Sequence, residues 1–439
     1  MNKVWILLLL TGGTLWGQTS YTLNKAIEYA TTNHLKLKNG ELDITKAEEL
    51  KKEYRAIGLP QVNMTGSFNN FLNLPVQVVS AKFFNPMAGD DELVSFRAGT
   101  NFSGNGTLQV SQLIFNGSYF IGVEAAKQMI DLQKTLLVQT QEEVVFNVMN
   151  AYHLAAVSKE NKRFSDSMVV VTEQLVKKQK NFFDLGMITQ EDVDQVNYAL
   201  LSAKNVAMSA QIQLDNSIAL LKMAMFYPLD QPLEVEEGVE TLLARATLSQ
   251  SGNIGNNLNL KLLNQQVDLD ELNIKNKKFA FYPTLSGYFQ QAYNAYRNDF
   301  DFFGKKPWFS QTNWGLQLNV PIFSSGQRYA QLQQTKIQLM KDENMVKITE
   351  NALKMQEIQA QNNLNGAKQK MDLQKENIRL AGVIYNNAVL KEQIGKGNSI
   401  DATQKYNQLM IAQAQYVGSL VEVFQAKLNL DKLYNQILK

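Results

Sequence analysis

The sequence contains no cysteine among its 439 residues. This absence excludes disulfide bonds, thiol nucleophiles, cysteine metal sites and a lipid anchor on an N-terminal cysteine. Histidine is nearly as rare, since only His34 and His153 occur, far apart in the chain. A lone histidine on a helical face is more often structural than functional, so we expect neither residue to bind a metal or to act in catalysis.

Neither sign of charge predominates, because 43 basic residues stand against 41 acidic residues. The chain therefore has no electrostatic signature of nucleic-acid binding, and nucleic acid is not a predicted partner. The sequence also lacks a phosphate-binding glycine loop, a metal-ligand cluster and a nucleophile–base arrangement. We predict no cofactor, no metal site and no enzymatic activity.

Long apolar runs are missing as well, apart from one short run at the N-terminus. Lys3 precedes the apolar segment Val4–Leu10, and a cleavage point falls near Gly17. This pattern predicts a secretory signal peptide over residues 1–17, and no later run reaches the ~20 residues of a spanning helix. We expect an exported chain that is either soluble beyond the inner membrane or spans an outer membrane as β-structure.

Proline is absent from two very long stretches, which predict two long helices. The first is predicted over 117–184 and the second over 326–394. Each begins after a strand-like segment and ends in a glycine turn, at Gly186 or at Gly395. A rise of about 1.5 Å per residue gives each helix a length of about 100 Å.

Four shorter segments alternate apolar and polar residues with the period of a β-strand. These predicted strands cover residues 61–71, 105–115, 284–294 and 313–323. The stretch 69–104 is rich in Asn, Pro, Gly and Asp, so it is predicted to be a long loop between the first two strands. A second loop is predicted over 294–312.

The order helix–strand–strand–long helix–turn–helix occurs twice, which predicts an internal duplication. Pro60 precedes the first strand pair as Pro283 precedes the second. We therefore divide the mature chain into a first repeat over 18–227, a linker over 228–257 that is irregular except for one short helix, and a second repeat over 258–439.

Four strands are too few to close a barrel, and open sheet edges cannot lie in lipid. If the strands cross a membrane, several chains must share one barrel, and three chains would supply twelve strands. The predicted fold class is therefore mainly α with a small β part. In this prediction a trimeric 12-strand β-barrel is continuous with a long periplasmic α-helical barrel.

These features resemble the TolC-type outer-membrane efflux proteins. The resemblance rests on the duplicated order, the Leu59-Pro60-Gln61-Val62 entry to a strand, the paired glycine turns and the opening pattern from Leu23 to Leu35. It implies a homotrimeric channel in outer-membrane lipid, with most of its mass in the periplasm and an equatorial-type linker at 228–257. It also implies two partners, a periplasmic adaptor and an inner-membrane pump of the resistance-nodulation-division or ATP-driven class.

The resemblance also implies where the channel closes. In that family, acidic side chains just after the second glycine turn form a periplasmic aperture, and these positions correspond to Asp401 and Gln404. The equivalents in the first repeat are Asp192 and Gln195. Because position 404 is an amide here, the resemblance implies a single acidic ring formed by Asp401. A ring of carboxylates at a constriction favours cations over anions.

The exposed tip around the glycine turns is implied to contact the adaptor through Gly186, Met187, Gly395 and Lys396. The residues themselves support a simpler interpretation of this region. Both glycines fit helix C-termini that need positive φ. Thr189-x-x-Asp192 and Asn398-x-x-Asp401 resemble capping boxes, which place the two carboxylates at positive helix N-termini.

One alternative for the whole chain is a periplasmic or surface coiled-coil scaffold without channel activity. This alternative explains the long helices but not the two alternating strand pairs. An enzyme, such as a surface hydrolase, is a distant third. The sequence does not specify the exported substrate.

Overall fold

The computed structural model describes residues 19–247 and 252–438, so the predicted signal peptide at 1–17 lies outside the described residues. The described chain is mostly helical with a smaller β part, as predicted. It falls into two compact units. The helical unit comprises the described parts of 1–43, 133–264 and 344–439, and the sheet unit comprises 44–132 and 265–343.

The helices are few and mostly long. Among the described residues they are α1 (Leu23–Asn33), α2 (Leu35–Ala56), α3 (Gly117–Asp184), α4 (Gln190–Met225), α5 (Val239–Thr247), α6 (Leu258–Phe279), α7 (Gln327–Gln393) and α8 (Ser399–Leu433). The two longest, α3 and α7, have 68 and 67 residues and lie within one residue of the predicted bounds. No helix in the described ranges has both the length and the hydropathy of a membrane span.

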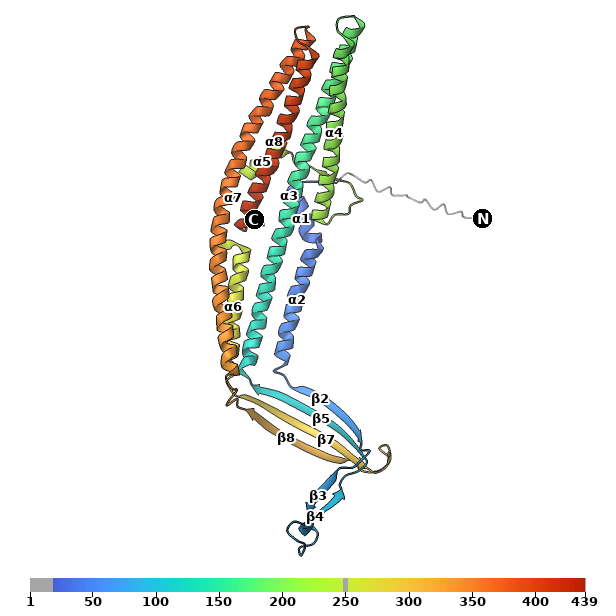
Figure 1. Ribbon diagram of the computed structural model, residues 1–439, viewed down its shortest axis with the longest axis vertical. Coiled ribbons are helices and arrows are strands. Elements are labelled where there is room, and N and C mark those ends of the chain that lie inside the picture. The colour runs from blue at the N-terminus through green and yellow to red at the C-terminus, as the bar shows by residue number, and fades with distance from the viewer. Residues whose placement is uncertain (1–18, 248–251, 439) are drawn as a thin grey trace, which may run out of the picture. The chain divides into compact units, whose positions relative to one another are not determined.

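Two helical hairpins run together in the helical unit. One is formed by α3 and α4, the other by α7 and α8, and their turns lie at the same end (Figure 1). Each of the four helices contributes to one buried cluster, which consists of Met168, Ala203, Tyr385, Tyr406 and Leu409. The burial of this shared apolar seam holds the two hairpins against each other.

A larger core in the same unit surrounds Tyr152 of α3, which is fully buried. Its hydroxyl donates a hydrogen bond to the carbonyl of Tyr21 over 2.8 Å and accepts one from the N–H of Glu237 over 3.2 Å. These bonds anchor a short parallel strand pair, β1 (Thr19–Tyr21) with β6 (Leu233–Val235). The predicted linker thus contains α5 (Val239–Thr247), the short helix expected there, and also β6, which was missed because three residues are too few for a strand period to be recognised.

The sheet unit is built on an antiparallel sheet in the order β2-β5-β7-β8 (Figure 1). Its strands are β2 (Gln61–Asn70), β5 (Phe102–Phe115), β7 (Thr284–Arg297) and β8 (Phe309–Asn319). The last strand ends four residues before its predicted end at 323. It stops there because Asn319 pairs with Thr284, the first residue of β7, and Pro321 has no N–H with which to extend the ladder.

The loop predicted over 69–104 is wrong in part. This segment contains an antiparallel hairpin of β3 (Val76–Ser80) and β4 (Leu93–Arg97), joined through the short 3-10 helix η1 (Ala81–Phe83). The turn-forming residues that favoured a loop lie outside the two strands, in the connection between them and in the segments that flank the hairpin. Each strand has only five residues, so the composition of the whole segment concealed them.

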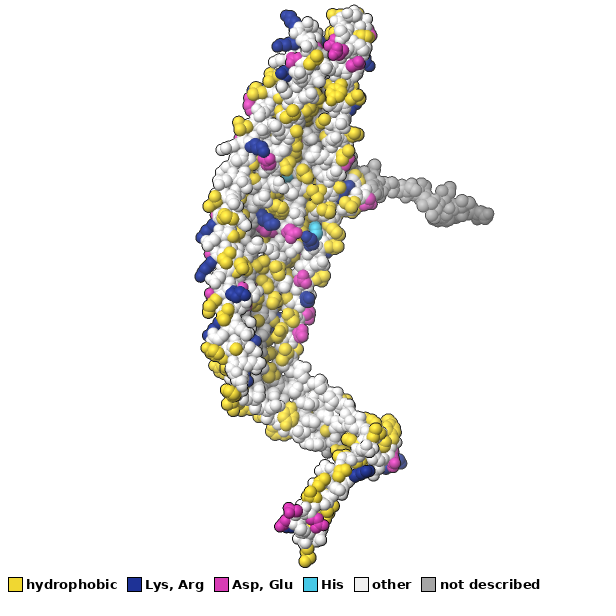
Figure 2. Space-filling view, viewed as in Figure 1, with side chains coloured by type: hydrophobic (Ala, Val, Ile, Leu, Met, Phe, Trp, Pro, Cys, Tyr) yellow, Lys and Arg dark blue, Asp and Glu magenta, His cyan; other side chains and the backbone are white. Residues whose placement is uncertain are grey.

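The two faces of the four-stranded sheet differ in chemistry, because side chains alternate along each strand. One row of directly paired residues is apolar and crosses all four strands, as Val62, Val110, Phe289 and Trp314. The adjacent row, on the other face, consists entirely of amides, as Asn63, Gln109, Gln290 and Asn313. The strands carry a single charged residue, Arg297, and Figure 2 shows few charged side chains over them.

Truncation of Leu221 on α4 tests how much the helical unit depends on its core. Leu221 is 0% exposed, whereas its neighbour Leu220 is 37% exposed. We expect Leu221→Ala to lower the free energy of unfolding by about 2–5 kcal/mol, because it removes buried methyl groups and leaves a cavity. Leu220→Ala is the matched control and should change stability by about 0.5 kcal/mol or less. Denaturant unfolding followed by far-ultraviolet circular dichroism measures both, and equal effects would contradict the assignment of the core.

Candidate functional site

The first candidate site is the turn between α3 and α4. Gly186 has φ of +70°, and its N–H bonds to the carbonyl of Phe183 over 2.8 Å. The N–H of Met187 bonds to the carbonyl of Phe182 over 2.9 Å. This is the Schellman pattern, in which a left-handed glycine lets the chain turn back over the last carbonyls of a helix. Met187 is left 68% exposed.

The turn between α7 and α8 repeats this geometry. Gly395 has φ of +73°, and its N–H bonds to the carbonyl of Glu392 over 3.1 Å. The N–H of Lys396 bonds to the carbonyl of Lys391 over 2.9 Å. Both predicted glycines therefore have the positive φ that the sequence indicated. Lys396 is exposed, and both turns present backbone and side chains to solvent.

Asp192 takes part in a complete capping box at the start of α4. The Thr189 hydroxyl oxygen accepts the Asp192 N–H over 3.3 Å, and Asp192 Oδ2 accepts the Thr189 N–H over 3.1 Å. The Thr189 hydroxyl also donates to Asp192 Oδ2 over 2.7 Å. The carboxylate of Asp192 is thus occupied by hydrogen bonds that cap the start of α4. Gln195, three residues further along α4, is half-buried.

Asp401 occupies the same place in α8 with different contacts. Its N–H donates to Asn398 Oδ1 over 2.8 Å, so Asn398 is the cap. The Asp401 carboxylate lies 4.0 Å from Lys405 Nζ, and its side chain is 51% exposed. Gln404, three residues further on, is also exposed. Of the two aspartates, Asp401 has the carboxylate that is more open to solvent.

A buried acid near these turns was missed by the sequence analysis. Glu392, in the last turn of α7, accepts a hydrogen bond from Nε2 of Gln179 on α3. Burial raises the pKa of Glu392 to about 7, and the nearby charge of Asp192 raises it as well. The signal in the sequence was its spacing, because Glu392 continues a buried helical stripe from Tyr385 and Ala388.

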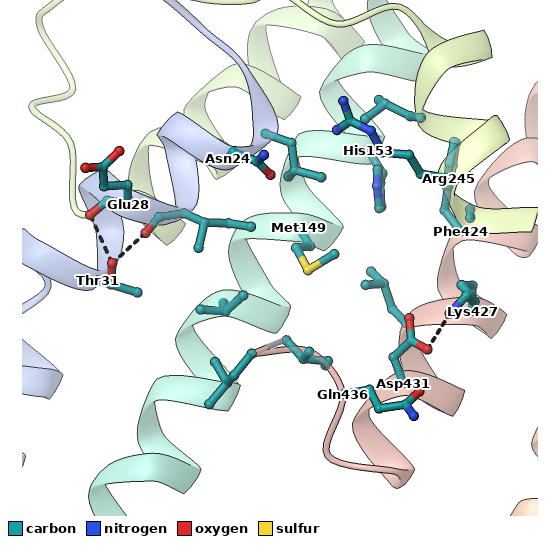
Figure 3. A pocket seen from close by; sticks show the side chains of 18 of the residues that line it. Asn24, Glu28, Thr31, Met149, His153, Arg245, Phe424, Lys427, Asp431 and Gln436 are labelled. Carbon is teal, nitrogen blue, oxygen red and sulfur yellow. Dashed lines mark hydrogen bonds and ion pairs between the residues drawn. The ribbon is translucent and has the colours of Figure 1, made fainter. Parts of the chain in front are cut away.

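A cavity of about 720 Å³ lies in the helical unit, lined by residues of α1, α3, α5, α8 and the chain that follows α8 (Figure 3). His153 stacks on Phe424 at its wall, with ring centroids 4.3 Å apart. Burial lowers the pKa of His153 to about 4, so the imidazole is neutral at pH 7 and packs as a core ring. Lys427 and Asp431, which also line the cavity, form an ion pair. The described chain holds no cluster of three metal-ligating side chains.

Comparison with protein families gives one match, over residues 252–436, to the family described as outer membrane efflux protein. A related protein is the outer membrane efflux protein BepC of Brucella suis biovar 1. It is 20% identical over 423 residues, which cover 95% of this chain and 86% of BepC.

Solved structures share the fold. The outer membrane protein VceC of Vibrio cholerae is 15% identical, with a TM-score of 0.69 over 94% of this chain and 95% of VceC. The CmeC outer membrane channel of Campylobacter jejuni is 16% identical, with a TM-score of 0.70 over 94% of this chain and 85% of CmeC. The predicted resemblance to TolC-type outer-membrane efflux proteins is therefore confirmed. The prediction that the chain is not an enzyme is confirmed by the same matches.

Replacement of Gly395 tests whether the turn depends on its positive φ. A Cβ at this position would meet no atom within 4 Å, so only the backbone conformation opposes it. We expect Gly395→Ala to destabilise the turn by about 1–2 kcal/mol, because a side chain disfavours the left-handed region. Amide hydrogen exchange around residues 391–398 should become faster.

Gly418 is the matched control, because it lies inside α8, where a Cβ would also meet no atom within 4 Å. Gly418→Ala should be neutral or stabilise α8 by up to about 1 kcal/mol, since alanine has the higher helix propensity. Slower or unchanged exchange at the turn in Gly395→Ala would contradict the conformational argument.

Proposed function

We propose that this relative of the TolC-type outer-membrane efflux proteins is the outer-membrane channel of a tripartite export system. In this proposal the chain acts as a passive duct, and an inner-membrane pump delivers substrates to it through a periplasmic adaptor. The family match and the shared fold support a channel role in efflux. The proposed location is the outer membrane, with most of the mass in the periplasm.

The observation that carries the proposal is the chemistry of the four-stranded sheet. Its apolar row and its amide row lie on opposite faces, as expected for strands that face lipid on one side and a water-filled lumen on the other. Met64 and Trp314, on the apolar face, are 80% and 76% exposed in the single chain. Exposed apolar surface of this kind indicates contact with lipid or protein.

The edges of this sheet support a trimer. β2 and β8 each pair with one neighbour within the described residues, so each has an open edge. Open edges cannot lie in lipid, and four strands are too few for a barrel. Three chains joined edge to edge would form the proposed 12-strand β-barrel, continuous with a periplasmic α-helical barrel.

The helical unit also exposes seams that a second copy would cover. Four large apolar residues of α4 are each more than half exposed, and they follow one another at spacings of 3, 7 and 4 residues. They are Tyr198, Leu201, Met208 and Ile212. Leu373, Leu380 and Ile384 form a similar exposed stripe on α7, with steps of 7 and 4. This spacing is that of a coiled-coil seam. Neighbouring protomers are the occupants that we propose for both stripes.

Paired element lengths support the proposed internal duplication. α2 and α6 both have 22 residues, α3 and α7 have 68 and 67, and α4 and α8 have 36 and 35. The repeats proposed at 18–227 and 258–439, with the linker 228–257 between them, place these helices in corresponding order. Both long helices also end in the same Schellman turn.

The ends of the hairpins are the proposed working part of the channel. We assign the aperture to Asp401 and Gln404, with Asp192 and Gln195 as their counterparts. The open carboxylate of Asp401 supports its role in the constriction, and Asp192 is the weaker candidate because its carboxylate is bound in the capping box. The solvent-exposed residues Gly186, Met187, Gly395 and Lys396 form the proposed adaptor contact.

Fractionation of the cell tests the channel against the coiled-coil scaffold alternative. A channel requires that the protein remain with the outer membrane until a detergent extracts it, and that the extract contain trimers. The purified trimer should then conduct ions when it is added to a planar lipid bilayer. Recovery in the soluble periplasm would contradict the channel and favour the scaffold.

Substitution of Asp401 tests the aperture. We expect Asp401→Ala to raise single-channel conductance and reduce cation preference, because the closed tip loses a carboxylate. Each trimer would lose three carboxylates at the proposed constriction. Asp215→Ala is the matched control, since it removes an exposed carboxylate of α4 that lies far along the helix from the turn. Unchanged conductance in assembled Asp401→Ala trimers would contradict a role for Asp401 in the aperture and leave it as a first-turn residue of α8.

A further inference from the structure

Glu392 is a carboxylic acid on an otherwise apolar stripe of α7, and only 5% of it is exposed. Gln179 of α3, 4% exposed, donates a hydrogen bond from Nε2 to Glu392 Oε1. The contact joins the last turns of the two long helices, and so ties the α3–α4 hairpin to the α7–α8 hairpin. It lies three residues before Gly395 in one hairpin and seven residues before Gly186 in the other.

Two oxygens at this contact have no hydrogen-bond partner. They are Oε1 of Gln179 and Oε2 of Glu392, and both are buried. If Glu392 is ionised, both oxygens are acceptors, so neither can satisfy the other. A proton on Oε2 converts it into a donor. The acid and the amide can then form two hydrogen bonds in a ring, from Gln179 Nε2 to Glu392 Oε1 and from Glu392 Oε2 to Gln179 Oε1.

We propose that Glu392 and Gln179 form a proton-dependent latch at the ends of the hairpins. The protonated acid pairs with the amide and holds the two hairpins together. Loss of the proton leaves a buried carboxylate beside an amide oxygen, so the hairpins separate and the aperture widens. The widening of the aperture rests on the proposed channel function, whereas the separation of the hairpins does not.

The charges around Glu392 are compatible with a switch near neutral pH. Burial is the main cause that raises its pKa to about 7, the hydrogen bond from Gln179 and the charge of Lys178 on α3 lower it, and the charge of Asp192 on α4 raises it. The pKa in the folded chain is thus above the ordinary value of 4.5. Protonation of Glu392 therefore stabilises the closed form at low pH, and this stabilisation is lost as the pH rises through about 7.

Two phenols on the packed helices do not titrate in this window. Burial raises the pKa of Tyr385, on α7, to about 12, and burial also raises the pKa of Tyr406, on α8, so both phenols stay neutral. At the start of α8, Asp401 and Lys405 carry opposite charges 4.0 Å apart. His153 has its pKa lowered to about 4 by burial, so it does not produce a step at pH 7.

The test is a conductance titration of purified protein in planar bilayers between pH 6 and pH 8. We expect the wild-type conductance to rise with a midpoint near pH 7, as the ionised fraction increases about tenfold between one unit below and one unit above the midpoint. Glu392→Gln replaces the protonated acid by a second amide that can form the same two hydrogen bonds. This variant should remain at the low conductance throughout.

The matched control is Glu142→Gln. Glu142, on α3, is also buried, and burial raises its pKa to about 7, but it lies 37 residues before Gln179. Glu142→Gln should keep the wild-type titration. A flat wild-type titration, a retained step in Glu392→Gln, or loss of the step in Glu142→Gln would each overturn the latch.

A second measurement remains valid if the chain forms no channel. Because the chain has no cysteine, Met187→Cys can carry a single spin label at the turn of the α3–α4 hairpin. In detergent, label mobility should increase between pH 6 and pH 8 in a Glu392 background and stay constant in Glu392→Gln. If the label mobility changes with pH as expected but the protein does not conduct, the channel is rejected and the latch is kept. If the mobility is constant in both backgrounds, the latch is rejected.

Discussion

The open edges of one small sheet are the constraint on which the rest of the proposed assembly depends. Every backbone N–H and C=O must find a partner in lipid, and β2 and β8 each offer an unpaired edge. Only further strands from other copies satisfy both edges at once. In the proposed trimer, symmetry would place copies of the helical unit next to one another, where the exposed seams of α4 and α7 would find partners. In the proposed assembly, the pairing of the β2 and β8 edges thus determines which faces of the long helices meet.

The order and the bounds of the long helices and main strands were predictable because the strongest signals in the sequence are local and repeated. The absence of proline and the two glycines at the turns located α3 and α7 to within one residue. The period of two placed the four main strands, and Pro60 and Pro283 marked where they begin. The capping residues Thr189 and Asn398 were likewise visible, because a cap depends on residues only three positions apart.

Features that depend on distant contacts were not predictable in the same way. The three-residue strands β1 and β6 pair with each other, and the Tyr152 hydroxyl bonds to the backbone at Tyr21 and at Glu237. Neither short strand carries a sequence pattern that predicts this distant partner. The hairpin of β3 and β4 was hidden in a segment rich in turn residues. Glu392 has the spacing of a buried stripe on α7, but its partner Gln179 follows only from the approach of α3.

Glu392 and the two aspartates place helix termination next to the contact proposed as a latch, at one end of the helical unit. A glycine turn ends each long helix by satisfying its last carbonyls, which leaves the neighbouring side chains free for other contacts. Asp192 uses its carboxylate to start the next helix, while the carboxylate of Asp401 faces solvent beside Lys405. Because Asp192 also raises the pKa of Glu392, the cap of α4 and the contact between α3 and α7 are electrostatically linked. In the proposed latch, a change in the charge of Glu392 therefore acts on the contact between the two hairpins and on the capping carboxylate beside it.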